Sequence, residues 1–181
     1  MEVSENNTIK KESEEKWYAL YTRPRAEKLV YKRLVDIGIE TFLPIQKTLR
    51  QWSDRKKIVE KPLIPSYIFV KTKSKFFPTV YNTDGVVSFI RFEGKPVCVT
   101  QREIDNLRLL VDSNADIELS SEKFEKGEQV KVTTGPLNGL TGELISSGDK
   151  KKVLVRIESL DKNIVVTIHT AFLAKIHQKD I

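Results

Sequence analysis

The chain has 181 residues, and its hydrophobic fraction of 39% is enough for the cores of one medium-sized and one small domain. No apolar run approaches the roughly 20 residues that a membrane-spanning helix needs, so we expect a cytoplasmic protein with no membrane contact. The single cysteine, Cys98, rules out an intramolecular disulfide. The two histidines, His169 and His177, lie far from it in sequence, so we expect neither a metal site nor a cofactor.

The net charge of +6 is unevenly distributed along the chain. Counting Lys and Arg as positive and Asp and Glu as negative, it is −3 for residues 1–15, +9 for 16–112 and 0 for 113–181. A basic segment beside a neutral one favours a polyanion as the partner of the first and a protein as the partner of the second. The same charge also fits a solvated surface that binds no nucleic acid.

The first predicted elements are a strand and a helix. Residues 1–15 have no hydrophobic periodicity and are predicted to be a disordered tail. A strand is predicted at 16–21, where aromatic and aliphatic residues lie close together. An Arg-Pro-Arg sequence then breaks the strand, and apolar residues at helical spacing predict a helix over 26–37 that ends at Gly38.

Residues 39–65 are rich in β-forming residues around a polar, basic loop, Arg55-Lys56-Lys57, which predicts a hairpin with a charged tip. A buried strand is predicted at 66–71 and a short helix at 76–82, where Pro78 interrupts it early. A further strand is predicted over 86–92.

Cys98 lies in an alternating apolar stretch and is expected to be buried. Thr100 and Glu103 have the spacing of a capping box, which predicts a last helix that continues to Val111. Strands outnumber helices, so residues 16–112 are predicted to form an α+β domain: an antiparallel sheet flanked by helices.

Residues 113–125 lose periodicity and are predicted to be a linker, and 126–181 alternate over short segments, which predicts a small five-stranded β-barrel. The most diagnostic stretch is its first turn, where glycines and a proline set the backbone. The turn residues are Gly135, Pro136, Gly139 and Gly142. This stretch resembles the KOW motif, a small SH3-like barrel.

Four segments before the barrel resemble, in order and spacing, the N-terminal (NGN) domain of the NusG family of transcription factors. They are WYALYTRPRAEKLVYKRL, FLPIQK (42–47), KPLIPSYIFVK (61–71) and GVVSFIRF (85–92). The sequence is most similar to specialised NusG paralogues of the UpxY and RfaH antiterminator types. Three features carry that similarity: Tyr21-Thr22-Arg23-Pro24 after the first strand, no long insertion in 39–52, and Ser66 in place of a usual glycine.

The resemblance implies that the NGN domain binds the clamp helices of the RNA polymerase β′ subunit through an apolar patch. The matching positions are Tyr21, Ile64, Tyr67 and Phe69. Because side chains alternate along a strand, either Tyr67 with Phe69 or Ile68 with Val70 faces away from the helices. We interpret Tyr67 and Phe69 as an outward pair, since an exposed aromatic patch usually marks a partner; all four also fit a sheet core.

The resemblance also implies contact with the non-template DNA strand of the transcription bubble. Arg23 and Arg33 match DNA-facing positions of the RfaH type, and Arg25 and Lys32 are neighbours able to contact phosphates; a solvated helix face fits equally well. Asp84 departs from that type, which has a basic residue there, so its base recognition is not transferred.

Two further contacts with the transcription complex are expected. The Arg55-Lys56-Lys57 tip is placed to reach upstream duplex DNA, although exposed charged loops are common. Phe76, Phe77, Pro78 and Thr79 match residues that meet the polymerase gate loop, and core packing of the two phenylalanines fits as well.

The expected function is that of a monomeric elongation and antitermination factor that suppresses pausing on specific, polysaccharide-type operons. A housekeeping NusG-like factor is the alternative, followed by a KOW-containing ribosomal or RNA-binding protein. We expect no enzyme, because the sequence has no Gly-rich phosphate loop, His/Cys cluster or nucleophile elbow. The family implies Rho or a small-subunit ribosomal protein as the partner of the barrel, and the β-branched strands give no reason to expect refolding into helices.

Overall fold

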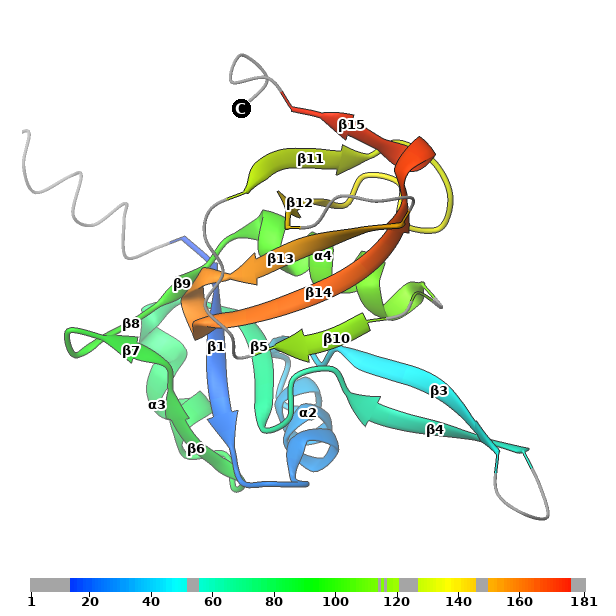
Figure 1. The fold of residues 1–181 in the computed structure, drawn as a ribbon. Coiled ribbons are helices and arrows are strands. Elements are labelled where there is room, and N and C mark those ends of the chain that lie inside the picture. Colours follow the sequence, from blue (N-terminus) through cyan, green and yellow to red (C-terminus); the bar gives the residue numbers. More distant parts are fainter. Residues whose placement is uncertain are drawn as a thin grey trace, which may run out of the picture. The chain divides into compact units, whose positions relative to one another are not determined.

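A computed structural model describes residues 14–51, 56–113, 115, 117–120, 127–145 and 150–176. Its contacts divide the chain into two compact units. Unit 1 consists of Met1–Pro44 and Ile64–Gln101, and unit 2 of Ile45–Leu63 and Arg102–Ile181. Each unit has its own sheet (Figure 1).

Unit 1 is built on a five-stranded antiparallel sheet of order β2-β5-β1-β6, in which β9 also pairs with β1. Its strands are β1 (Lys16–Thr22), β2 (Glu40–Phe42), β5 (Tyr67–Thr72), β6 (Val86–Phe89) and β9 (Cys98–Val99). A small hairpin follows β6 and joins β7 (Arg91–Phe92) to β8 (Lys95–Pro96). The antiparallel sheet predicted for this part of the chain is therefore present.

The helices of unit 1 are α2 (Glu27–Asp36), the 3₁₀ turn η1 (Ser74–Phe76) and α3 (Phe77–Tyr81). Leu20 pairs with Ile68 across β1 and β5, and both are fully buried. Two residues along β1, on the same face, Tyr18 contacts the ring of Phe77 in α3, with centroids 4.9 Å apart. The helical side of the sheet is thus the Ile68 side, and Tyr67 and Phe69 lie on the other.

Most predicted elements of unit 1 are confirmed. Helix α2 ends before Gly38 as predicted, and the φ of 81° at Gly38 favours a glycine. Two predictions are corrected. The strand predicted over 86–92 is interrupted at Ile90, which separates β6 from β7. Cys98 is exposed instead of buried, because the inward position of the short strand β9 is taken by Val99.

Trp17, in β1, contacts Gln101, the first residue of helix α4 (Gln101–Asp112). The indole ring is buried, and its Nε1–H donates a hydrogen bond to Oε1 of Gln101 at 3.0 Å. The two residues are 84 positions apart in sequence. Both residues belong to unit 1, so this contact ties β1 to Gln101 within that unit.

In unit 2, β3 (Ile45–Gln51) and β4 (Lys56–Pro62) form the predicted hairpin, with Ile45 opposite Pro62 and Gln51 opposite Lys56. The two arms are drawn in cyan and green-cyan in Figure 1. Arg55 and the side chains of Lys56 and Lys57 lie outside the described residues, so the predicted DNA contact of this tip stays a prediction.

The larger sheet of unit 2 has the order β10-β14-β13-β12-β11-β15, with all neighbours antiparallel. The strands are β10 (Ile117–Ser120), β11 (Glu128–Val132), β12 (Thr141–Leu144), β13 (Lys150–Ile157), β14 (Lys162–His169) and β15 (Leu173–Lys175). The 3₁₀ turns η2 (Glu158–Leu160) and η3 (Thr170–Phe172) precede the last two. Val153, Val155 and Ile164 are at most 1% exposed, but Leu154 and Val165 are buried as well, so burial in the middle of β13 and β14 does not follow the predicted alternation.

Strand β10 lies inside the segment 113–125 that the sequence predicts to be a linker. Ile117 pairs with Val166 and Leu119 with Ile164, so two apolar residues at alternate positions add a strand to the edge of β14. The acidic and polar neighbours obscure this alternation of only two residues in the sequence.

The KOW turn has the backbone that its glycines predict. Gly135 and Gly139 adopt φ values of 79° and 96°, where side chains are strained. Gly142 has a different requirement: a Cβ atom there would lie 2.6 Å from the backbone oxygen of Leu154. Pro136 is exposed in the turn.

From Arg102 onward, α4 groups with the barrel and not with the sheet of unit 1, although the predicted first domain ends at residue 112. The amide of Asn106 donates to the Thr141 backbone oxygen (3.1 Å) and accepts from the Thr141 N–H (3.3 Å). The Glu103 carboxylate accepts a hydrogen bond from the Ser159 N–H at 3.4 Å. These contacts join residues 35 and 56 positions apart, which sequence patterns do not reveal.

Candidate protein-binding and nucleic-acid-binding surfaces

Two tyrosines form an aromatic pair on the face of the unit 1 sheet opposite α3. Tyr21 and Tyr67 are register partners on β1 and β5, and their rings meet edge-on with centroids 5.5 Å apart. Tyr21 is 37% exposed and Tyr67 is half-buried. An exposed ring held by a second ring offers rigid apolar area to a partner. We call Tyr21 and Tyr67 the aromatic surface.

The other two predicted contact residues are buried. Phe69 lies on the same side of β5 as Tyr67, but its exposure is 0%, and Ile64 is 1% exposed. Phe69 packs beside Phe42 on the neighbouring strand β2, with ring centroids 6.1 Å apart. The expected exposed pair Tyr67 and Phe69 is therefore wrong for Phe69, because alternation assigns a face but does not say how much of that face is covered.

The turn before β5 is held by a buried carboxylate. Ser66 has a φ of 66°, and its N–H donates to Oε1 of Glu27 at 2.8 Å. The Ser66 backbone oxygen accepts from the Thr22 N–H at 2.8 Å. Glu27 is only 6% exposed although it lies in the first turn of α2. Glu27 and Ser66 thus fix the backbone from which Tyr67 projects.

Burial raises the pKa of the Tyr67 hydroxyl above its usual value, and the nearby Tyr21 hydroxyl adds to the effect. A tyrosine whose pKa rises above 10 stays neutral at physiological pH. The Tyr67 ring is therefore uncharged, which suits an apolar contact better than an ionic one.

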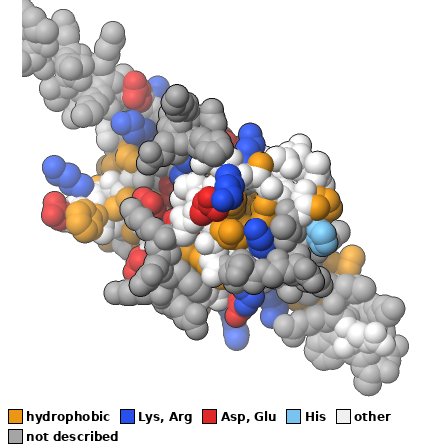
Figure 2. All heavy atoms as spheres, turned by 45° about the horizontal axis from the view of Figure 1, so that its top comes forward, with side chains coloured by type: hydrophobic (Ala, Val, Ile, Leu, Met, Phe, Trp, Pro, Cys, Tyr) orange, Lys and Arg blue, Asp and Glu red, His pale blue; other side chains and the backbone are white. Residues whose placement is uncertain are grey.

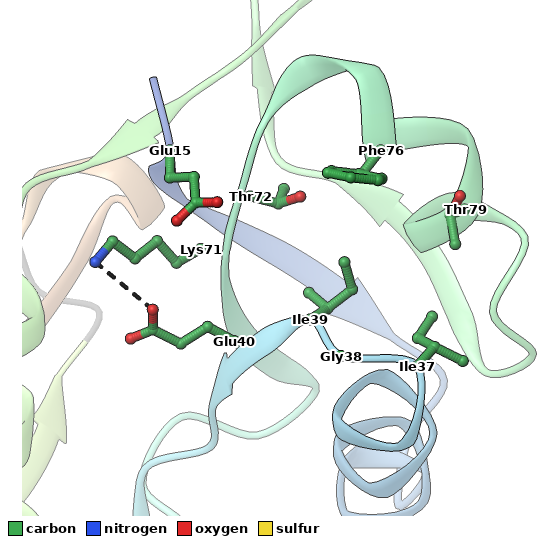
Figure 3. Close-up of a pocket in the computed structure, with 9 residues that line it drawn as sticks. All are labelled: Glu15, Ile37, Gly38, Ile39, Glu40, Lys71, Thr72, Phe76 and Thr79. Carbon is green, nitrogen blue, oxygen red and sulfur yellow. Dashed lines mark ion pairs between the residues drawn. The ribbon is translucent and has the colours of Figure 1, made fainter. Parts of the chain in front are cut away.

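A hollow of about 260 Å³ opens elsewhere on unit 1, between the end of α2, strand β2 and η1 (Figure 3). Ile37, Ile39 and Phe76 supply apolar side chains to its wall. At its other side Nζ of Lys71 lies 3.6 Å from a carboxylate oxygen of Glu40. Glu15, which also lines the hollow, lies 3.9 Å from Nζ of Lys73, so both of its lining carboxylates are paired with lysines.

The residues matched to the gate-loop contact have different environments. Phe77 packs with Tyr18 and with Phe89, whose ring centroid is 4.7 Å away, as the core-packing alternative expects. Phe76 is exposed, and the Lys75 ammonium lies 4.8 Å from its ring centroid. Phe76 and Thr79 line the hollow and Pro78 is exposed.

The basic residues predicted to face DNA are on the surface, and two of them share one carboxylate. Nη1 of Arg23 lies 3.2 Å from Oδ1 of Asp84, and Nη1 of Arg33 lies 2.8 Å from Oδ2. Arg25 and Lys32 are exposed. We call Arg23, Arg33 and Asp84 the arginine cluster.

The space-filling view in Figure 2 shows one face of the molecule, on which basic, acidic and apolar side chains are interspersed. No helix in the described part of the chain is long and apolar enough to cross a membrane. Among the same residues, no three His, Cys, Asp or Glu side chains are grouped to hold a metal ion.

Sequence reasoning missed Glu27 and the bridging role of Asp84. Glu27 in a first helical turn has the pattern of an ordinary solvent-facing carboxylate. Asp84 is noticed in the sequence only as a departure from a basic position. Both roles depend on partners between 39 and 61 positions away, which no local pattern specifies.

Known proteins similar to this chain agree with the fold. A family model described as the transcription termination factor nusG matches residues 15–108. The transcription termination/antitermination protein NusG of Rickettsia typhi is 28% identical over 81% of this chain and 84% of its own length. The NusG protein of Chlamydia trachomatis is 30% identical over 78% of this chain and 85% of its own.

A solved structure described as domain interaction in Thermotoga maritima NusG covers 91% of this chain and 98% of its own, with a TM-score of 0.54 and 23% identity. It supports the fold alone, and the predicted α+β class with an NGN domain and a KOW barrel is confirmed. The chain belongs to the NusG family, whose members are transcription factors and not enzymes.

Proposed function

We propose that this protein is a transcription elongation and antitermination factor that binds the clamp helices of the RNA polymerase β′ subunit through its aromatic surface. The observation that carries the proposal is the exposed Tyr21 ring held edge-on by Tyr67. Ile64 and Phe69 are buried in unit 1 and support this surface without touching a partner.

A second contact is proposed with the non-template DNA strand through Arg23 and Arg33, with Arg25 and Lys32 adjacent to them. Guanidinium groups bind phosphates and stack on unpaired bases, and both actions suit a flexible single strand. The exposed Phe76 and Thr79 at the rim of the hollow are proposed to meet the gate loop on the opposite side of the polymerase cleft.

The proposed mechanism is mechanical. A factor that contacts both sides of the DNA cleft binds the closed clamp more tightly than the open, paused one. By linkage, it shifts that equilibrium by its difference in affinity for the two states. Fewer pauses and passage through terminators follow.

Action on specific, polysaccharide-type operons is proposed over a housekeeping role. Ser66 supports it: a residue with a side chain occupies a left-handed backbone position, where the general factor is expected to have glycine. The barrel is proposed to recruit a second protein, either the termination factor Rho or a small-subunit ribosomal protein, and the factor is proposed to act as a monomer.

The test is binding of the full chain to an isolated β′ clamp-helix fragment. Replacing Tyr21 and Tyr67 together by alanine should weaken binding by about tenfold or more, since buried interface tyrosines commonly each contribute more than about 1 kcal/mol. The matched control replaces Tyr31 and Tyr81, which are also exposed but lie on α2 and α3.

The control should bind like the unaltered protein. Equal affinity of the Tyr21/Tyr67 variant, with its circular dichroism unchanged, would refute the assigned surface. Failure of the unaltered chain to bind the fragment would favour the ribosomal or RNA-binding alternative.

A further inference from the structure

The arginine cluster places one carboxylate between two guanidinium groups. Each oxygen of Asp84 has a different partner: Oδ1 is 3.2 Å from Arg23 Nη1 and Oδ2 is 2.8 Å from Arg33 Nη1. Arg33 Nη1 also donates to the backbone oxygen of Asp84 at 2.7 Å. The group therefore carries two positive charges and one negative charge, and the acceptor lies between the donors.

The backbone fixes this arrangement. The Arg23 N–H donates to the backbone oxygen of Gly85 at 2.9 Å, which ties the end of β1 to the Asp84 loop. Gly85 has a φ of 97°, and a Cβ atom there would lie 2.6 Å from Cγ2 of the buried Val30 in α2. The loop is thus held closely against α2, the helix that carries Arg33.

A phosphate that approaches Arg23 and Arg33 meets Asp84 at the same donors. The carboxylate repels the phosphate and already accepts hydrogen bonds from both arginines. Because the Asp84 side chain is 62% exposed, the ion pairs are weak and are screened by salt. Asp84 therefore lowers the affinity for phosphate without blocking access to it.

We propose that Asp84 sets how strongly this surface holds a nucleic-acid strand. It attenuates binding of the phosphate backbone by Arg23 and Arg33, so that free single strands are held weakly. The surface then contributes mainly where polymerase presents the strand beside it. This inference rests on the proposed function, since it takes Arg23 and Arg33 to face the non-template strand.

The test measures binding of the full chain to a fluorescein-labelled 12-nucleotide thymidine strand by anisotropy, over a series of salt concentrations. Asp84→Asn keeps the size of the side chain and removes its charge, and should tighten binding about three- to tenfold at low salt. The slope of log affinity against log salt should steepen by about 0.7 if one more phosphate contact forms. Asp84→Ser, checked for folding by thermal melting, should change affinity in the same direction.

Two controls separate this effect from a change of net charge. Asp36→Asn removes the same charge at an exposed site three residues after Arg33 on α2, and should gain less than Asp84→Asn because both arginines pair with Asp84 in the described contacts. In a chain with Arg23→Ala and Arg33→Ala, adding Asp84→Asn should bring no gain.

Unchanged or weaker binding by Asp84→Asn would overturn the inference, as would an equal gain from Asp36→Asn or a gain that persists without the two arginines. The proposed DNA contact is judged separately by Arg23→Ala with Arg33→Ala alone. If that pair weakens binding while Asp84→Asn changes nothing, the contact stands and the attenuating role of Asp84 is lost.

Discussion

The aromatic surface and the arginine cluster each include one residue at the end of β1, Tyr21 and Arg23, which are two positions apart in sequence, yet different interactions hold them in place. Tyr21 is placed by the strand register opposite Tyr67. Arg23 is placed by a loop that contacts α2 through Gly85 and Asp84. A surface whose residues are positioned by strand pairing can be predicted from the alternation of side chains in the sequence. A surface whose residues are positioned by loop contacts cannot be predicted in this way. The two can also be disturbed independently.

The largest expected effect comes from removing the carboxylate that anchors the Tyr67 turn. Glu27→Ala leaves the buried Ser66 N–H without its acceptor, and should lower the free energy of unfolding by about 2 to 3 kcal/mol, the cost of losing a buried charge-assisted hydrogen bond. Urea titration measures the loss. Clamp-helix binding should weaken as well, while thymidine-strand binding stays within about twofold.

Glu27→Gln is the matched control, because its amide oxygen still accepts from Ser66 and most of the stability should return. Equal destabilisation by both variants would mean that the charge of Glu27, and not its hydrogen bond, holds the turn.

A smaller loss is expected from disturbing the loop of the arginine cluster. Gly85→Ala forces a side chain into a left-handed conformation and against Val30, and should cost about 2 kcal/mol. The effect on binding should be the opposite of that of Glu27→Ala: the affinity for the thymidine strand changes, and the affinity for the clamp helices does not. Gly94→Ala offers a comparison, since it is also at positive φ but has open space around the added Cβ.

If Gly85→Ala weakens clamp-helix binding as much as strand binding, the two surfaces are not independent. The aromatic surface and the arginine cluster would then depend on the same backbone contacts.

The smallest effect should be a gain. Ser66→Gly removes the strain of a side chain at a φ of 66°, and should raise the free energy of unfolding by about 0.5 kcal/mol after the entropy of glycine in the unfolded chain is subtracted. Thermal melting detects it as a higher midpoint. A lower midpoint would show that the Ser66 side chain stabilises the turn more than its backbone conformation costs.

The sequence predicts the strands, the helix at 26–37, the β3–β4 hairpin and the KOW turn, because periodicity, glycine and proline act over a few residues. Sequence patterns do not predict burial or strand pairing where the residues that cover a side chain or pair with a strand come from distant segments. Phe69 alternates as Tyr67 does, but it packs beside Phe42 and is buried. Ile117 and Leu119 have too short a pattern to stand out, yet they pair with β14.

The candidate site divides in the same way. Tyr21, Tyr67 and the four basic residues are found at the surface, where alternation and charge predict them. Glu27 and Asp84 are recognised only once the structure brings them to Ser66 and to the arginines. Their signal in sequence would be paired variation between distant positions, which a single sequence does not contain.

The hydrogen bond from Trp17 to Gln101 also gives the molecule an intrinsic optical probe. The chain has two tryptophans, and replacing Trp52 by phenylalanine would leave the buried indole as the sole source of tryptophan emission. That indole contacts the residue at which α4 begins. Its emission would therefore report when Trp17 and Gln101 lose their hydrogen bond, and would do so in solution, in real time and without an attached dye.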